Sequence, residues 1–537
     1  MAEKNSNIEK VARSAVFLSI GSIITVILSF VKESVFAFCF GTSAEADAYS
    51  TAGELPVTLL SFISVAISTV LIPINAKIRA NKGEEKAKEF LNELITFVFL
   101  FSLVFVILLE IFAPVVIRIV APGFDDYTTN LAAKIIRFVL LTTSLSLLIK
   151  IFTGISNIYD RFFLVSLHPN IFSLSVIAFS LLFYRSLGIA APVLGLLVGK
   201  SIEFLYTVFL IRKKYRYRPS FHFGSEGMRA SYKLCLPVFV GIAVDELNKL
   251  ADKFFVSFFQ TGSVASLHYA ARLSSGISTL FVTALNTAIY PELSRKAAGG
   301  DNKATAKIYS FAIQVYMLLL IPIIVGGTFL GSDIVSLVFG HGAFSSESVA
   351  TTAPLFTLYL SCLLFTSIMY VSANMFYASG NSKKPMINTS ISVAINIILD
   401  LIFIELIDSP VALPLATLIA TSIVCFKTLH DIKKINPEVS YRRNLQSLGK
   451  IAVGAGAMLV VLFAVRFVFV RLIGIHGTVL SILYMAISLV LGVVVYFGIE
   501  KLLKVEEVDF AVQKIGTLFK KFLKSKKHTS QEPEDNA

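Results

Sequence analysis

The sequence predicts an all-α membrane protein with about 14 transmembrane helices, and three observations support this prediction. Hydrophobic residues make up 55% of the 537 residues and charged residues only 15%, whereas a soluble domain carries about 25% charged residues. The apolar residues form long runs, and an α-helix needs roughly 20 such residues to cross the hydrocarbon core. Basic residues gather in alternate loops between these runs, as the positive-inside rule requires.

The apolar runs predict the transmembrane helices in chain order. No small-residue cleavage site follows the first run, so we expect this run to be retained as a helix and not removed as a signal peptide. The expected spans are residues 12–40, 50–76, 90–120, 130–155, 164–184, 187–211, 232–259, 264–293, 306–339, 351–378, 386–406, 409–427, 447–472 and 477–503.

The charges of the loops orient these spans. If the N-terminus is cytoplasmic, the loops that follow even-numbered spans should be basic. These loops carry Lys77, Arg79, Lys82, Lys86, Lys88, Arg212, Lys213, Lys214, Arg216, Arg218, Arg295, Lys296, Lys303, Lys383, Lys384, Lys433, Lys434, Arg442 and Arg443. The opposite loops are mostly neutral or acidic, although two short turns hold one cation each, Arg185 and Arg471. We therefore expect both termini in the cytoplasm, and the net charge of +13 needs no nucleic-acid partner to explain it.

An internal repeat predicts how the helices are grouped. Four segments of the first half match segments about 220 residues later, for example GTSAEADAY (41–49) with TGSVASLHY (261–269) and APGF (121–124) with HGAF (341–344). This offset equals six spans, an even number, so both copies should have the same orientation. A chance likeness of glycine- and proline-rich loops is the alternative. The expected parts are a six-helix lobe at 1–220, a second six-helix lobe at 221–440, two extra transmembrane helices at 441–505, and a cytoplasmic amphipathic or disordered tail at 506–537.

Ionisable side chains inside the spans are costly in lipid, so each is a functional candidate. Lys32 and Glu33 lie in the first span, Glu54 in the second and Arg272 early in the eighth. The seventh span carries Asp245, Glu246, Lys249, Asp252 and Lys253, four of which share one helix face that should point into the bundle. In the eleventh span, Asn396 and Asp400 are one turn apart and could converge on a cation, with Thr417 of the next span completing an oxygen shell. A polar network between helices without an ion is the alternative.

Several motifs carry a resemblance to a known family. They are FVKESVFAFCFGTSAEADAY (30–49), ELPVTLL (54–60), APGF (121–124), NIYDRF (157–162), DKFFVSFFQTGSVASLHYAARL (252–273), FGHGAF (339–344) and MFYASGNSKKP (375–385). With them the chain resembles the MurJ/MviN family, the lipid II flippases of the MOP exporter superfamily. The resemblance implies a monomeric transporter of the bacterial cytoplasmic (inner) membrane, not an enzyme. Its expected partners are membrane lipids and a polyprenyl-pyrophosphate-linked glycan, most simply lipid II, which it moves to the outer leaflet by alternating access.

The resemblance also implies roles for individual residues. Lys32 and Glu33 occupy the positions of an Arg-Asp pair in the family, so Lys32 is expected to contact the pyrophosphate while Glu33 holds and gates it; a structural ion pair is the alternative. Arg272 matches the functional arginine of the family's YAxRL pattern, against the alternative of a side chain that snorkels to the interface. Asp47 matches the acid of the ADA(F/Y) motif, and is expected either to close an outer gate or to cap a helix.

The same resemblance implies an ion site. Family members proposed to bind sodium combine an Asp, an Asn-x-x-x-Asp pair and a Thr, which here correspond to Asp252, Asn396, Asp400 and Thr417. We therefore expect coupling to sodium or to protons, and no other cofactor.

The chain also departs from the family in ways that keep other functions open. Val26 and Leu60 stand near the places where the family has further cavity arginines, and lysine at position 32 lacks the bidentate fork of arginine. A flippase for another lipid-linked oligosaccharide, of the exopolysaccharide or O-antigen type, is therefore an alternative. A cation-coupled small-molecule antiporter of the same superfamily is another, although the two extra C-terminal spans argue against it.

Overall fold

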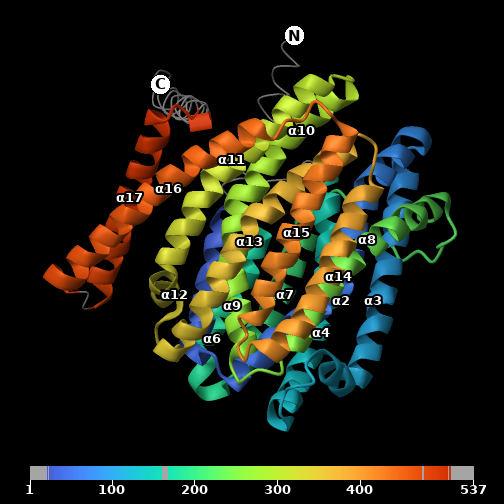
Figure 1. Ribbon diagram of the computed structural model, residues 1–537. Coiled ribbons are helices and arrows are strands. Elements are labelled where there is room, and N and C mark those ends of the chain that lie inside the picture. Colours follow the sequence, from blue (N-terminus) through green and yellow to red (C-terminus); the bar gives the residue numbers. More distant parts are fainter. Residues whose placement is uncertain (1–20, 22, 160–166, 475–476, 506, 509–537) are drawn as a thin grey trace, which may run out of the picture. The chain divides into compact units, whose positions relative to one another are not determined.

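The computed structural model describes residues 21, 23–159, 167–474, 477–505 and 507–508 (Figure 1). Within these ranges the regular structure is helical and no strand occurs, so the expected all-α fold is confirmed. The expected start of the first span at residue 12 and nearly all of the expected tail at 506–537 lie outside the described residues.

The helices follow one another with short connections. They are a first helix Ile23–Phe40, α2 Ala44–Lys82, α3 Glu84–Val120, α4 Asp126–Ile158, α6 His168–Leu187, α7 Ala190–Ile211, α8 Glu226–Val256, α9 Ser263–Ile277, the π-helical η1 Ser278–Thr283, α10 Ala284–Ala298, α11 Asn302–Phe329, α12 Gly331–Phe339, α13 Ser346–Ala378, α14 Lys383–Leu406, α15 Ala412–Ile435, α16 Arg442–Val468, the π-helical η2 Phe469–Ile473 and α17 Thr478–Leu502.

Capping residues set the starts of several of these helices. The side chains of Ser43, Asp125, Ser225 and Asp301 each accept a hydrogen bond from the backbone N–H three residues later, at the first turns of α2, α4, α8 and α11. A cap of this kind satisfies one of the four N–H groups that a helix start leaves without a partner. The polar residue before each apolar run therefore determines where that helix begins.

Twelve of the described helices are long and apolar enough to cross a membrane, and they match twelve of the expected spans. The two expected spans without such a match are 232–259, which lies in α8, and 264–293, which covers α9, η1 and α10. α8 is 31 residues long, but its five charged residues between 245 and 253 lower its hydropathy, and the next span is interrupted by a π-helix. The chain is therefore a multi-pass membrane protein, and these two less apolar segments account for the difference between twelve and the expected 14.

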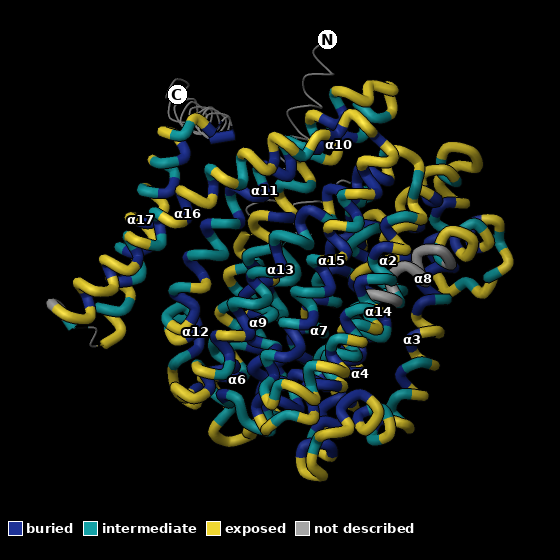
Figure 2. The backbone as a smooth tube through the Cα atoms, in the orientation of Figure 1, coloured by how far each residue is buried: buried dark blue, intermediate teal, exposed yellow. Residues whose placement is uncertain are grey.

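Large apolar side chains remain exposed on the described helices. Figure 2 shows exposed residues recurring along α16 and α17, where Val460, Phe463 and Val479 are between 58% and 79% exposed. In water, contiguous apolar surface of this kind favours association. A lipid environment accommodates it, because hydrocarbon chains solvate such side chains.

The helices pack into two compact units. The first unit comprises 1–280, 338–359 and 386–420, and its cores include Leu60, Leu71 and Ile136. The second comprises 281–337, 360–385 and 421–537, and its core includes Tyr309 and Tyr496. These units divide the chain at other positions than the expected lobes 1–220 and 221–440, so the lobes and their parallel repeat stay predictions.

Candidate functional site

Six ionisable side chains from four helices of the first unit meet in one cluster. They are Lys32 and Glu33 of the first helix, Glu54 of α2, Lys253 of α8, and His268 and Arg272 of α9. We call this group the cation cluster, because it holds three permanent cations against two carboxylates, before any charge on the histidine is counted.

Glu33 forms the closed end of the cation cluster, with only 4% of its surface exposed. Lys32 Nζ lies 2.9 Å from Glu33 Oε1, and His268 Nε2 lies 3.3 Å from Glu33 Oε2. Arg272 Nε is 3.8 Å from Glu33 Oε1. Three positively charged or protonatable groups thus surround this carboxylate, which is the arrangement that keeps a buried acid paired.

Glu54 forms the more open end of the cation cluster. Its carboxylate receives Lys253 Nζ at 3.0 Å and Arg272 Nη2 at 2.7 Å. His268 Nδ1 lies 3.3 Å from Glu54, so the two ring nitrogens of this histidine face two different carboxylates. The imidazolium form satisfies both contacts as donors, whereas a neutral ring would turn a lone pair toward one of the carboxylates.

The helices position these groups in simple ways. His268 and Arg272 are four residues apart on α9 and therefore lie on the same helix face. Lys253 is fixed further by a hydrogen bond of 3.0 Å from its ammonium to the backbone carbonyl of Ser50.

Arg272 gives the cation cluster its free binding capacity. Its side chain is 42% exposed, and its buried Nε has no hydrogen-bond acceptor. A guanidinium presents donors in a planar fork that matches phosphate and carboxylate groups. With one positive charge in excess and a guanidinium that is partly exposed, the cluster is suited to an anion.

Asp47 lies apart from these cations. Its carboxylate accepts hydrogen bonds from the backbone N–H groups of Gly262, at 2.5 Å, and Ala265, at 2.7 Å, which begin α9. Gly262 has a φ of +92°, and a Cβ there would overlap the carbonyl oxygen of Thr42. In this structure Asp47 therefore caps α9, the alternative that the sequence left open, and its gating role stays a prediction.

The four residues expected at an ion site lie on α8, α14 and α15 of the first unit. Asp400 is completely buried and neither of its carboxylate oxygens has a hydrogen-bond partner; one oxygen each of Asp252 and Asn396 is likewise without a donor. Asn396 Nδ2 lies 3.4 Å from Thr417 Oγ1, so α14 and α15 approach each other at this point.

Buried oxygens without donors are rare, and hard cations bind oxygen ligands. Among the described residues, no three His, Cys, Asp or Glu side chains are grouped to hold a metal ion. Two carboxylates, an amide and a hydroxyl are oxygen ligands of the kind that hard cations prefer, and the expected ion site stays a prediction.

The remaining polar residues of α8 are divided. Glu246 is partly buried and pairs with Lys249 at 2.9 Å, but the Lys249 side chain is 60% exposed, contrary to the expectation that it points into the bundle. This lysine reaches back to a carboxylate three residues earlier on its own helix. The side chain of Asp245 lies outside the described set.

Sequence reasoning did not assign His268, although it lies one turn before Arg272 within the quoted motif. It also gave Glu54 and Lys253 no partner. Their convergence depends on the packing of α2, α8 and α9, and a single sequence does not reveal it.

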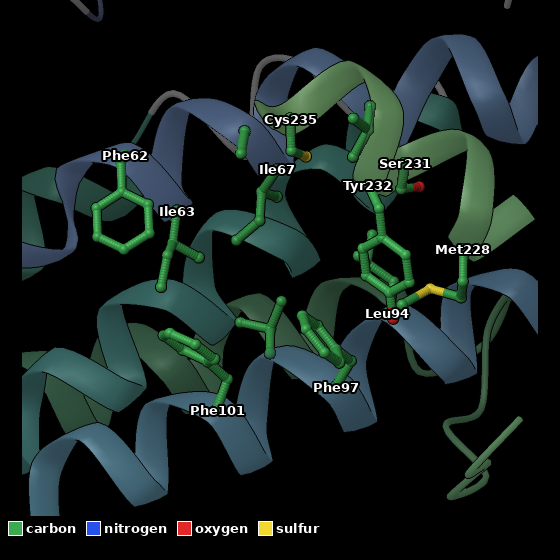
Figure 3. A pocket seen from close by; sticks show the side chains of 13 residues that line it. Phe62, Ile63, Ile67, Leu94, Phe97, Phe101, Met228, Ser231, Tyr232 and Cys235 are labelled. Carbon is green, nitrogen blue, oxygen red and sulfur yellow. The ribbon is translucent and has the colours of Figure 1, made fainter. Parts of the chain in front are cut away.

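A separate apolar cavity of about 420 Å³ lies between α2, α3 and α8 (Figure 3). Its lining includes Phe62, Ile67, Phe97 and Met228, and its few polar contributors are Ser231, Tyr232 and Cys235. No charged side chain lines it. The cavity fits hydrocarbon and not a phosphate group.

Comparison with known proteins places the chain. A family model described as "Lipid II flippase MurJ" matches residues 36–478, well over half of the chain. The chain belongs to the MurJ lipid II flippase family. The resemblance inferred from the motifs is thereby confirmed, and so is the expectation of a transporter family and not an enzyme family.

MurJ relatives match along most of their length. A probable lipid II flippase MurJ of Thermotoga maritima is 29% identical over 493 residues, which cover 91% of this chain and 96% of the relative. The corresponding protein of Rickettsia prowazekii is 25% identical over 513 residues, covering 93% and 98%.

Solved structures agree with this placement. A structure of lipid II flippase MurJ in an inward closed conformation has a TM-score of 0.79 at 26% identity, and covers 92% of this chain and 100% of that chain. An inward-facing multidrug resistance MATE transporter of the MOP superfamily has a TM-score of 0.63 at 14% identity, covering 80% and 100%. The second likeness shows a shared fold only.

Proposed function

We propose that this chain is an alternating-access flippase that moves a polyprenyl-pyrophosphate-linked glycan, the peptidoglycan precursor lipid II, from the inner to the outer leaflet of the bacterial cytoplasmic membrane. Membership of the MurJ family supports the substrate. The observation that carries the mechanism is the cation cluster, with its excess positive charge among membrane-spanning helices. A diphosphate crosses hydrocarbon only if fixed groups replace its hydration, and cations do this best.

In this proposal Lys32 and Arg272 contact the diphosphate. Both are now paired with carboxylates, Lys32 with Glu33 and Arg272 with Glu54. When phosphate oxygens take over these two cations, His268 still contacts both carboxylates, so neither is left as an isolated buried charge. After the diphosphate has been released, the carboxylates neutralise the cations again. This lowers the electrostatic cost of the step in which the protein, with its site empty, returns to the state that receives substrate from the inner leaflet.

We also propose that sodium binds at Asp252, Asn396, Asp400 and Thr417 and couples to transport. A bound cation would provide partners for the buried oxygens of Asp252, Asn396 and Asp400 that have no hydrogen-bond donor. Asp252 directly precedes Lys253, whose ammonium lies on Glu54. Occupation of the ion site can therefore act on the cation cluster through a single turn of α8. A proton on Asp400 is the alternative, and replacing sodium by choline at constant pH separates the two.

The finer topology belongs to the same proposal. Both termini lie in the cytoplasm, since the basic loops follow the even-numbered spans. The protein acts as a monomer among membrane lipids, with the lipid-linked glycan as its partner and without nucleic acid.

A flippase for an exopolysaccharide or O-antigen type lipid is the second candidate, and one observation favours it. Leu60, near the place of a cavity arginine in the family, is only 1% exposed and lies in an apolar core of the first unit. No cation can occupy that position without rearrangement, so the binding site differs from the one that the family pattern describes.

Complementation tests the proposed function. A bacterium is depleted of its resident lipid II flippase, this chain is expressed, and growth and outer-leaflet lipid II are measured. We expect rescue. A protein that is well expressed in the membrane but does not restore outer-leaflet lipid II would contradict the lipid II assignment and favour the second candidate.

A further inference from the structure

A second buried ion group lies in the first unit, on α6 and α7, which pack against each other. Glu203 of α7 is 2% exposed and contacts Lys200 Nζ at 2.8 Å and His168 Nδ1 at 2.6 Å. His168 Nε2 lies 3.2 Å from the Thr153 hydroxyl. None of these residues was assigned a role from the sequence, and none belongs to the contacts of the cation cluster.

Phe172 of α6 connects this group to the cation cluster. The ammonium of Lys200 lies 4.6 Å from the centre of the Phe172 ring, and the ammonium of Lys32 lies 5.4 Å from the same point. The sum of the two distances, about 10 Å, is the largest separation that the two nitrogens can have, and both contacts are within the range of a cation–π interaction. Two lysines from different helices therefore present their charges around one aromatic ring.

The pairing of these lysines leaves them able to bind an anion. Each ammonium carries three N–H donors, and each contacts one carboxylate. Neither carboxylate belongs to its lysine alone, since Glu33 also contacts His268 and Glu203 also contacts His168. The Lys32 and Lys200 side chains are 15% and 21% exposed, so both are sheltered but reachable.

We propose that Lys200 is a further substrate-binding residue, which holds one phosphate of a lipid-linked diphosphate while Lys32 holds the other. The proposal rests on the proposed function. Lys200 supplies a cation that the chain lacks at Val26 and Leu60, and Phe172 sets the spacing of the two ammonium groups. When Lys200 turns toward phosphate, Glu203 keeps its short contact with His168 and is not left without a partner. Two flexible ammonium groups tolerate a range of phosphate orientations, unlike a pair of guanidinium forks.

The test compares lipids that carry one or two phosphates. The full chain in nanodiscs is titrated with lipid II and, separately, with undecaprenyl monophosphate, and bound lipid is measured by native mass spectrometry. Lys200→Ala should weaken lipid II binding about tenfold, since a charge-assisted hydrogen bond is lost, and change monophosphate binding by less than about threefold. Lys200→Arg should retain most of the lipid II affinity.

Two further variants separate binding from folding. Lys249→Ala is the matched control, because Lys249 also pairs with a carboxylate three residues away but has an exposed side chain; it should leave both affinities unchanged. In Lys200→Ala the Glu203 carboxylate loses one of its two partners. The double variant Lys200→Ala/Glu203→Gln removes this charge as well, and its affinity for lipid II should still be about tenfold lower than that of the wild type.

The outcomes are distinguishable. Wild-type protein that binds no lipid II contradicts the proposed function itself. If the wild-type protein binds lipid II, and Lys200→Ala and Lys200→Ala/Glu203→Gln bind it as tightly as the wild type, the Lys200 assignment alone is overturned. Equal weakening toward both lipids also overturns it, because a diphosphate-specific role predicts a difference. Inorganic pyrophosphate that competes at the same concentration as lipid II would assign the lysine pair to a free diphosphate and overturn the lipid assignment.

Discussion

Lys32→Ala removes the ammonium that pairs with the buried carboxylate of Glu33. In the structure this ammonium contacts Glu33 at 2.9 Å and is 15% exposed, so a phosphate at the same place would be largely shielded from water. A hydrogen bond between charged groups contributes about 1.5–3 kcal/mol, and 1.4 kcal/mol corresponds to a factor of ten in affinity. The variant should therefore bind lipid II about 10- to 150-fold more weakly.

The fold should survive this change. Glu33 keeps the contacts with His268 Nε2 at 3.3 Å and Arg272 Nε at 3.8 Å, so no isolated buried charge is created. Binding is measured with purified protein in nanodiscs, beside Lys32→Arg, which should keep most of the affinity, and Lys249→Ala, which should keep all of it. A folded Lys32→Ala protein with wild-type affinity for lipid II would refute the reasoning.

Three further predictions concern the ion site and the start of α9. Asp400→Asn should abolish the dependence of transport on sodium, measured in proteoliposomes in which sodium is replaced by choline at constant pH. If the variant depends on sodium as the wild-type protein does, the ion site is excluded. If transport by the wild-type protein does not depend on sodium, coupling to protons is favoured. Asp47→Ala should lower the free energy of unfolding by about 1–2 kcal/mol, because two backbone N–H groups at the start of α9 lose their acceptor; an unchanged thermal transition would contradict the cap. Gly262→Ala should lower the melting temperature more than Gly300→Ala does: both glycines have positive φ, but a Cβ would overlap the Thr42 carbonyl only at the first. Equal shifts would show that the close approach does not matter.

The sequence was sufficient to predict the twelve apolar helices that are long enough to cross the membrane. The expected span 232–259 coincides with most of α8, but the charged residues between 245 and 253 lower the hydropathy of this helix, so composition alone does not mark it as a span. Lys249 illustrates the limit of periodicity: four polar residues share a face in the helical repeat, yet this side chain is exposed and pairs with a carboxylate of its own helix. The bounds of the two packed units depend on contacts between distant segments, which periodicity does not contain.

The parts of the candidate site that could be predicted are those in which the interacting residues are close in the sequence. Lys32 and Glu33 are neighbours in the chain, so their pair could be expected, whereas the partners of Glu54 come from α8 and α9. Asp47 shows why residue type alone does not decide a role, because the same carboxylate can cap a helix or pair with a cation. Lys200 escaped notice because its link to Lys32 passes through the side chain of Phe172.

The most direct test of the account is the rate at which lipid II crosses the bilayer in proteoliposomes that contain this chain. The central claim is that fixed cations shield the diphosphate of the headgroup during its passage. Wild-type protein should deliver lipid II to the opposite leaflet, and Lys32→Ala/Arg272→Ala, if folded and inserted, should reduce the rate to that of protein-free vesicles. Transport by the double variant at the wild-type rate would contradict the claim.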